Sequence, residues 1–232
     1  MRVLGIVTAR GGSKGLPGKN IMPLCGKPML AWTAEAALGS VLTRTVLSTD
    51  DEQIAEVGRQ CGLDVPFLRP AELARDDTGS VPVLMDVVRR LALAGDRYDA
   101  VLTLQPTSPL RLSTDIDGAI ALLAETGADS VISLTHVRNR HPAKMKLLGI
   151  DGRIMDPPFA EQIPNRRRQE LDDVYIREGS IYLTRTSILM GGSITGADSR
   201  AWLVPPERAI DVDDRVDFLV AQALLRDRLG PC

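Results

Sequence analysis

Residues 3–20 read VLGIVTARGGSKGLPGKN, an apolar run that passes directly into a loop rich in glycine and positive charge. The apolar part predicts a buried β-strand. Arg10, Lys14 and Lys19 place three cations on the loop. The loop also contains Gly11, Gly12, Gly15 and Gly18. Glycine lets the backbone take positive φ and approach a ligand closely, so N–H groups and charges together predict a polyphosphate site. The alternative is a surface turn with solvated charges.

The spacing of this loop excludes two common phosphate-binding motifs. A P-loop requires Gly, four residues and then Gly-Lys-Ser/Thr, but Ser13 stands five positions before Gly18, and Asn20 follows Lys19. The dinucleotide fingerprint G-x-G-x-x-G fails as well, because Ser13 stands two positions after Gly11. The loop therefore belongs to a third type.

Length and composition predict one globular domain with an aliphatic core. The chain has 232 residues, of which 44% are hydrophobic and only 3% aromatic. A net charge of −2 and a pI of about 5.8 argue against a nucleic-acid partner. No apolar run approaches the roughly 20 residues of a membrane span, and the short N-terminal run does not resemble a signal peptide. We expect a soluble, cytoplasmic protein without a membrane partner.

The cysteines and histidines offer no recognisable site. Cys25, Cys61 and Cys232 lie far apart and form no C-x-x-C pair, so we expect reduced thiols. His136 and His141 lack the spacing of metal ligands, and the sequence shows no recognisable Ser-His-Asp arrangement. The sequence therefore gives no support for covalent nucleophilic catalysis.

Apolar runs alternate with helical patterns along the chain, which predicts an α/β fold with a doubly wound sheet. The expected strands are 3–7, 45–48, 65–68, 100–104, 130–134, 180–184 and 202–204. The expected helices are 28–38, 51–60, 82–94, 114–126 (with Ser113 as N-cap) and 213–229.

Residues 136–179 interrupt this rhythm and fit no regular helix. The segment contains Pro142, Pro157, Pro158 and Pro164 and the run Arg166-Arg167-Arg168. We interpret it as an inserted subdomain or an extended hairpin arm. The arginine run could bind carboxylate or phosphate in a bidentate fork, although such runs are more often a solvated face or a subunit contact. We expect one of the three arginines to meet a ligand.

Four predicted strands end in unusually polar segments, at residues 10–20, 48–50, 105–111 and 211–213. In doubly wound folds, ligands bind beyond the carboxyl ends of the strands. The segment 105–111, QPTSPLR, is stiffened by two prolines and is otherwise able to form hydrogen bonds except at Leu110. It predicts a polar small-molecule pocket, with a rigid surface turn as the alternative.

A pair of carboxylates forms a candidate metal site. Asp211 and Asp213 flank Val212, and alternate residues of an extended segment face the same way. Mg²⁺ prefers oxygen ligands and typically takes one or two carboxylates together with substrate phosphates. Asp214 is expected to cap the following helix. The alternative is that all three aspartates belong to the first turn of that helix.

These motifs together resemble one family, the acylneuraminate cytidylyltransferases (CMP-sialic acid synthetases). The matching segments are ARGGSKGLPGKN at 9–20, STD at 48–50, RPAELA at 69–74, QPTSPLR at 105–111, Arg168-Gln169 with Leu171, GSIY at 179–182 and IDVD at 210–213. The resemblance implies a Rossmann-like nucleotidyltransferase three-layer sandwich over residues 1–232, with residues 136–179 as an inserted dimerisation arm. It also implies a homodimer that transfers CMP from CTP to a nonulosonic acid with Mg²⁺ or Mn²⁺ and releases pyrophosphate.

The resemblance also assigns roles to residues of this chain. The triphosphate and its loop would involve Arg10, Gly11, Gly12, Ser13, Lys14 and Lys19. The nucleoside would lie near Asn20, Arg69 and Ser80, and the sugar acid near Gln105, Lys144 and Arg168. Asp211 and Asp213 would hold the metal, and catalysis would depend on Arg10, Lys14, Lys19 and Asp211.

Two departures from the family pattern leave the sugar open. Leu171 is followed by Asp172 where the family often has proline, and Glu178 begins a Glu-Gly-Ser-Ile-Tyr segment where Asn-Gly-Ala-Ile-Tyr is common. Legionaminic, pseudaminic and Kdo acids are the alternatives, although Kdo enzymes usually have a differently built first loop. A non-catalytic nucleotide-binding module is a further alternative, which the presence of Lys19 and the aspartate pair opposes.

Overall fold

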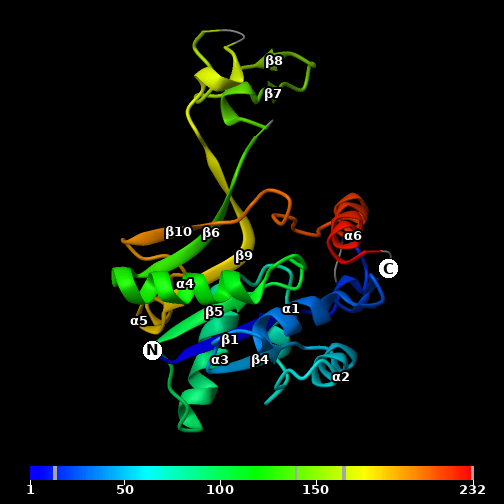
Figure 1. Cartoon of the computed structure of the whole chain (residues 1–232), viewed down its shortest axis with the longest axis vertical. Coiled ribbons are helices and arrows are strands. Elements are labelled where there is room, and N and C mark those ends of the chain that lie inside the picture. The colour runs from blue at the N-terminus through cyan, green and yellow to red at the C-terminus, as the bar shows by residue number, and fades with distance from the viewer. Residues whose placement is uncertain (13–14, 139, 164–165, 231–232) are drawn as a thin grey trace.

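A mixed sheet of six strands forms the centre of the computed structural model, which describes residues 1–12, 15–138, 140–163 and 166–230 (Figure 1). The strands are β1 (Val3–Thr8), β2 (Pro23–Leu24), β3 (Lys27–Pro28), β4 (Arg44–Ser48), β5 (Ala100–Leu104), β6 (Ser130–His136), β7 (Leu147–Leu148), β8 (Ile154–Met155), β9 (Tyr175–Arg185) and β10 (Ser199–Leu203). The α-helices are α1 (Met29–Leu38), α2 (Glu52–Gln60), α3 (Ser80–Leu93), α4 (Ser113–Thr126), α5 (Thr186–Met190) and α6 (Arg215–Leu229). Short 3₁₀ helices are η1 (Lys19–Ile21), η2 (Ala71–Leu73), η3 (Pro142–Lys144) and η4 (Arg168–Glu170).

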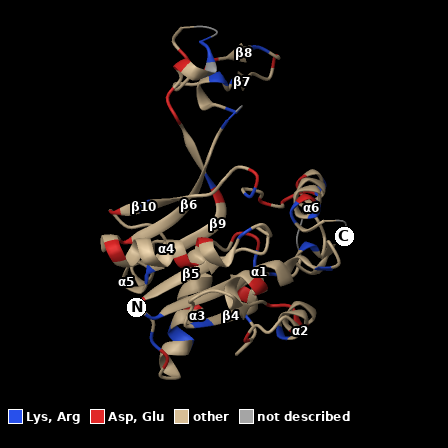
Figure 2. Ribbon diagram, viewed as in Figure 1, with Lys and Arg blue, Asp and Glu red and all other residues tan. Residues whose placement is uncertain are grey.

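Helices cover both faces of the sheet, so the molecule has three layers. Side chains of α1, α2 and α4 pack on one face, in a core that includes Leu30, Ile54 and Ile116. Side chains of α3 and α5 pack on the other face, where Leu84 and Leu189 contact β1, β4 and β5 residues. Figure 2 shows the strands at the centre of the sheet as largely uncharged, with charged segments on helices, loops and the arm. The predicted α/β fold is confirmed.

The order of the strands places a ligand site at one point of the sheet. The order is β10-β6-β9-β5-β1-β4, in which β9 runs antiparallel to β5 and β6 and the other neighbours are parallel. The chain passes from β1 through α1 to β4 on one side, whereas β5 lies on the other side of β1. The reversal between β1 and β5 is a topological switch point, and the crevice at their carboxyl ends is where such sheets bind ligands.

Local sequence accounts for the starts of α2 and α6. Asp51 caps α2 by accepting hydrogen bonds from the N–H groups of Gln53 (2.8 Å) and Ile54 (3.1 Å). Asp214 caps α6 in the same way, by accepting from Val216 N–H at 2.7 Å, as predicted. Asp211 and Asp213 therefore precede the helix rather than forming its first turn.

Two local predictions are wrong. Residues 65–68 form no strand, because the chain meets β4 only at a single bridge between Val46 and Asp64, and Pro66 has no N–H to continue the ladder. Ser113 is the first residue of α4 rather than its N-cap; Leu112 occupies the cap position and donates its N–H to Asp115 (2.9 Å). The helix predicted at 82–94 begins at Ser80, and the last strand is Ser199–Leu203 rather than 202–204.

Beyond the sheet, β6 and β9 continue as the stem of a projecting arm (Figure 1). The paired ladder reaches His136 opposite Tyr175, so β9 begins inside the segment predicted as an insertion. The small hairpin of β7 and β8 and the 3₁₀ helices η3 and η4 lie at its end. Within the described part of the chain, no helix is long and apolar enough to cross a membrane.

Candidate active site

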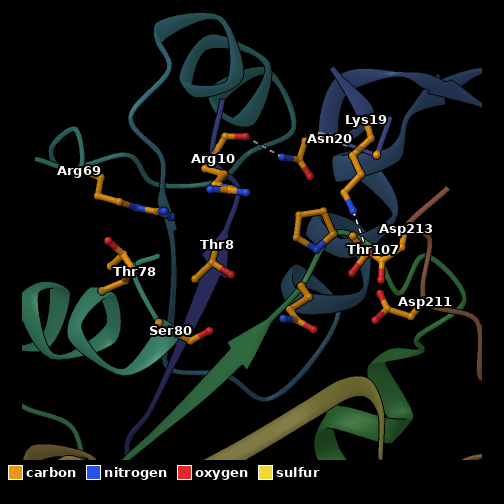
Figure 3. Close-up of a pocket in the computed structure, with 15 residues that line it drawn as sticks. Thr8, Arg10, Lys19, Asn20, Arg69, Thr78, Ser80, Thr107, Asp211 and Asp213 are labelled. Carbon is orange, nitrogen blue, oxygen red and sulfur yellow. Dashed lines mark hydrogen bonds and ion pairs between the residues drawn. The ribbon is translucent and has the colours of Figure 1, made fainter. Parts of the chain in front are cut away.

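A cleft of about 590 Å³ opens at the carboxyl ends of β1 and β5, at the switch point of the sheet (Figure 3). Its walls come from Arg69 and from four segments: the end of β1 with the loop that follows it, residues 78–83 at the start of α3, residues 105–107 after β5, and the segment 211–213 before α6. These segments are far apart in sequence. Three of them were predicted above as polar strand ends, but 211–213 follows no strand directly, because β10 ends at Leu203. The structure brings these three segments together at the carboxyl ends of β1 and β5.

The loop after β1 is held in place by its neighbours. Asn20 is buried and donates its side-chain N–H to the carbonyl of Arg10 at 3.0 Å, and Gly11 donates its N–H to Asp50 at 3.1 Å. Gly15 approaches the segment before α6 so closely that a Cβ atom there would lie 2.5 Å from the carbonyl oxygen of Asp213. Glycine is required at this position because no side chain fits between the two segments.

Lys19 connects this loop to the carboxylates. Its ammonium donates to the carbonyl of Val212 at 2.9 Å and to Asp213 Oδ1 at 3.0 Å. Figure 3 shows the side chain reaching from the loop toward both aspartates. A cation and two carboxylates thus share one wall of the cleft.

The two carboxylates face the cleft because Val212 faces away from it. Val212 is buried against α1 and α6, and its N–H donates to the carbonyl of Thr107 at 2.8 Å. Asp211 and Asp213 therefore point to the open side, as the alternation predicted (Figure 3). Although Asp211 is open toward the cleft, desolvation by the surrounding protein raises the pKa of its carboxyl, and Asp213 adds to this, while the Thr107 hydrogen bond and Lys19 oppose it.

The opposite wall is formed by Arg69 and the start of α3. Arg69 is buried and donates to Ser48 twice, from Nη2 to the carbonyl at 2.6 Å and from Nε to Oγ at 3.1 Å. Burial lowers the pKa of this guanidinium. Ser80 lines the cleft as the first residue of α3. The polar end of β4 thus supports the cleft from behind rather than lining it.

A loop before α3 lies beside Arg10 at the cleft. Asp76 accepts a hydrogen bond from Arg10 Nη1 at 2.6 Å. Thr78 and Gly79 line the cleft beside Ser80, and the predictions missed them. The polar run Asp77-Thr78-Gly79-Ser80 directly before a helix was the available signal, but the helix was expected to begin two residues later.

Comparison with known proteins identifies the family. A cytidylyltransferase family model matches residues 4–194. The chain belongs to the cytidylyltransferase family. It is 33% identical over 228 residues to CMP-N,N'-diacetyllegionaminic acid synthase of Legionella pneumophila, covering 97% of each chain. It is 34% identical to N-acylneuraminate cytidylyltransferase of Streptococcus agalactiae, with 94% of this chain covered but only 52% of that protein, so the chain spans about half the length of this relative.

A solved structure supports the fold of this cytidylyltransferase. CMP:2-keto-3-deoxy-manno-octonic acid synthetase, determined in complex with CTP, superposes with a TM-score of 0.73 over 99% of this chain and 100% of that chain. The sequence identity is 18%, so the likeness concerns the fold alone. The family match, rather than this likeness, shows that the chain is a CTP-dependent nucleotidyltransferase, as the resemblance implied.

The cytidylyltransferase cleft contains some of the expected residues but not others. Arg10, Lys19, Asn20, Arg69, Ser80, Gln105, Asp211 and Asp213 all line it. Gly11 and Gly12 instead line a smaller adjoining hollow with Asp51. Ser13 and Lys14 lie outside the described residues.

Two of the expected sugar-binding residues lie in the arm. Lys144 belongs to η3 and donates its ammonium to the carbonyl of Arg166 at 2.9 Å. The backbone of Arg168 belongs to η4, and its side chain lies outside the described part of the molecule. The arm projects away from the sheet (Figure 1), so within one chain η3, which carries Lys144, lies away from the cleft.

The segment after β5 differs from its prediction in one respect. Gln105 and Thr107 line the cleft, but Ser108 and Arg111 turn inward and are almost completely buried. The segment was predicted to form a polar small-molecule pocket, with a rigid surface turn as the alternative. Arg111 instead holds the backbone behind the cleft through the carbonyls of Ser180 and Gln105, whereas the buried Ser108 hydroxyl has no hydrogen-bond partner among the described residues.

Proposed function

We propose that this cytidylyltransferase transfers CMP from CTP to the anomeric hydroxyl of a nonulosonic, sialic-type acid and releases pyrophosphate. The observation that carries the proposal is the position of Lys19, which joins the glycine-rich loop to the Asp211–Asp213 pair in one cleft. Cations suited to phosphates and carboxylates suited to a divalent metal then face the same volume. Relatives that match the whole length of the chain, including a CMP-legionaminic acid synthase, support a sugar-acid acceptor.

The nucleotide would occupy the cleft between the glycine-rich loop and α3. Arg10 and Lys19, together with Ser13 and Lys14 and the backbone around Gly11 and Gly12, would bind the triphosphate. Asn20, Arg69 and Ser80 would lie along the nucleoside. When the acceptor attacks the α-phosphate, negative charge grows on the phosphate oxygens, and Arg10 and Lys19 would stabilise it in place of water.

The carboxylates fit a divalent cation. Asp211 and Asp213 face the cleft on either side of a buried residue, and their mutual repulsion contributes to the raised pKa of Asp211. A hard cation with phosphate oxygens completing its ligand set would relieve that repulsion. Bound there, Mg²⁺ or Mn²⁺ would supply electrostatic stabilisation of the phosphate oxygens. Asp211 also lies on the acceptor side, where it could draw the proton from the attacking hydroxyl.

The acceptor would lie beside Gln105, with Lys144 and Arg168 supplied by the arm of a second copy. The arm exposes many large apolar side chains, which is unusual on a surface that stays in water. The most exposed is Ile150, followed by Leu148 (76%), Ile154 (73%), Ile163 (66%) and Phe159 (58%). We propose that these residues form a homodimer interface that places each arm over the partner's cleft.

The test is pyrophosphate release from CTP and Mg²⁺ with a panel of N-acetylneuraminic, legionaminic, pseudaminic and Kdo acids. UTP and ATP serve as nucleotide controls. Release with CTP and N-acetylneuraminic acid is the expected result. Release with legionaminic or pseudaminic acid alone would keep the reaction and change the acceptor. No release with any acid, from folded protein that still binds CTP, would overturn the proposal in favour of a non-catalytic nucleotide-binding module.

A further inference from the structure

Arg111 is a buried arginine that joins three segments behind the acceptor side of the cleft. Only 4% of the residue is exposed. Its Nε donates to the carbonyl of Ser180 at 2.6 Å, and its Nη2 donates to the carbonyl of Gln105 at 2.8 Å. Its Nη1 donates to Thr33 Oγ1 on α1 at 3.2 Å. One guanidinium thus connects β9, the loop after β5 and α1.

Burying the charge of Arg111 in this arrangement does not by itself stabilise the folded state. Burial lowers the pKa of Arg111 to about 10, against the opposing attraction of the Glu178, Asp115 and Asp211 carboxylates, so it stays charged at neutral pH. Within the described residues no carboxylate lies within 4.0 Å of the guanidinium, which donates to neutral oxygens. An apolar side chain of similar volume often serves stability as well as a buried charge does. The planar fork, by contrast, fixes the relative positions of its acceptors.

Glu178 holds the same region from the other side. It is 6% exposed, and its Oε1 accepts hydrogen bonds from the N–H and the hydroxyl of Ser180. Its Oε2 is buried and has no hydrogen-bond partner in the described part of the chain. Ser180 is therefore held by Arg111 through its carbonyl and by Glu178 through its two donors.

Both contacts act on an irregular part of β9 that lies behind two residues of the cleft lining, Gln105 and Asp211. Tyr182 pairs with Ile132 and Arg177 with Leu134, so five steps along β9 oppose two along β6. Gly179, at the centre of this bulge, has φ of 94°. A Cβ atom there would lie 3.3 Å from Gln105 Oε1 and 3.4 Å from Asp211 Oδ2. The bulge therefore packs directly against the side chains of Gln105 and Asp211.

We infer that Arg111 is a positioning residue that, with Glu178, sets the distance between Gln105 and the Gly179–Ser180 backbone and so shapes the acceptor side of the cleft. Its three hydrogen bonds reach none of the residues proposed to bind CTP, which are Arg10, Lys19, Asn20, Arg69 and Ser80. The inference rests on the proposed function, because it assumes a sugar acid beside Gln105. It predicts a defect that is selective for the acceptor.

The test is Arg111→Lys, which keeps the charge but cannot reach three acceptors with one ammonium. Using the sugar acid that the wild-type protein accepts, we expect the acceptor KM to rise about tenfold, while Kd for CTP measured without acceptor changes less than about twofold. Arg185→Lys is the matched control. Arg185 lies on β9, the strand that contains Ser180, and donates to the carbonyl of Ala128 at 2.7 Å. It pairs with Ala100, the first residue of β5, at the end of the strands opposite the cleft. It should leave both constants unchanged.

A second variant tests the same inference if Arg111→Lys does not fold. Glu178→Gln keeps the shape of the side chain, removes the charge facing Arg111 and should raise the acceptor KM about threefold or more without changing CTP affinity. Equal losses for CTP and acceptor, or an unchanged acceptor KM in both variants, would overturn the inference. An inactive wild-type protein would instead count against the proposed function, so the two failures are distinguishable.

Discussion

The cleft and the arm are built in opposite ways, although both carry residues expected to bind substrate. In the cleft, Arg69, Asn20 and Lys19 each have hydrogen-bond partners supplied by the sheet and the segments around it. In the arm, β7 and β8 have two residues each, and apolar side chains such as Leu148 and Ile154 face outward. The comparison teaches that the hydrogen bonds of one chain hold the cleft side chains in place, whereas the arm leaves apolar side chains exposed, as the proposed second copy over the cleft would require.

The largest expected effect tests the cleft. Lys19→Ala should lower turnover by about 10²–10³-fold, as for loss of one positioned charge stabiliser. Steady-state pyrophosphate release measures it. Lys27→Ala is the control, because Lys27 pairs with Glu35 and lies over the Trp32 ring outside the cleft. Equal turnover in the two variants would remove Lys19 from the phosphate role.

The next prediction compares an ion pair of the sheet body with one of the arm. Asp115→Asn should lower the free energy of unfolding by about 3 kcal/mol, because it leaves Arg208 partly buried without its carboxylate. Asp156→Asn, which removes the exposed partner of Lys146 in the arm, should cost less than about 1 kcal/mol. Urea unfolding of both variants measures the difference, and similar losses would contradict it.

The same pair predicts a pH dependence. Burial alone would raise the pKa of Asp115, but hydrogen bonds from Arg208, the Leu112 N–H and Trp202 outweigh it and hold the pKa below its usual value. A lowered folded pKa stabilises the protein above the unfolded pKa of roughly 4, and this contribution is lost as pH falls through the folded pKa. The stability gap between wild type and Asp115→Asn should therefore narrow below about pH 4. A difference in the free energy of unfolding that does not change with pH would refute the lowered pKa of Asp115.

A smaller effect is expected at the metal site. Asp211→Asn should raise the Mg²⁺ concentration needed for half-maximal activity by about tenfold. Asp214→Asn is a close control, since it removes a nearby charge while asparagine still caps α6. A normal magnesium titration in Asp211→Asn would exclude Asp211 as a ligand.

The smallest expected effect on CTP affinity comes from substitutions in the arm. The double variant Leu148→Glu with Ile154→Glu should dissociate the proposed dimer in sedimentation experiments while changing CTP affinity less than about twofold. Activity with the sugar acid should fall, because Lys144 and Arg168 would no longer reach a partner's cleft. Leu93→Glu, at an exposed leucine on α3, is the control. A variant that stays dimeric, or a wild type that is monomeric, would contradict the proposed interface.

Much of the cleft could be predicted from sequence, for reasons that are local. The strand-to-loop change at residues 8–10 and the alternation around Val212 concern neighbours in the chain, and the structure confirms both. Parallel strands bring their carboxyl ends to one edge, so polar strand ends converge without further information. The missed residues Thr78 and Gly79 follow from a helix that begins two residues before the predicted start.

The sequence by itself determined the α/β class, the glycine-rich loop, the paired aspartates and the cytidylyltransferase family, because each depends on short-range pattern or motif. Only the tertiary structure decided that Arg111 turns inward and that β9 bulges under the cleft. It also decided that Lys144 lies on an arm away from Gln105. These facts depend on contacts between segments up to 78 residues apart, such as Thr33 with Arg111, and neither composition nor periodicity encodes which distant groups will share a buried hydrogen bond.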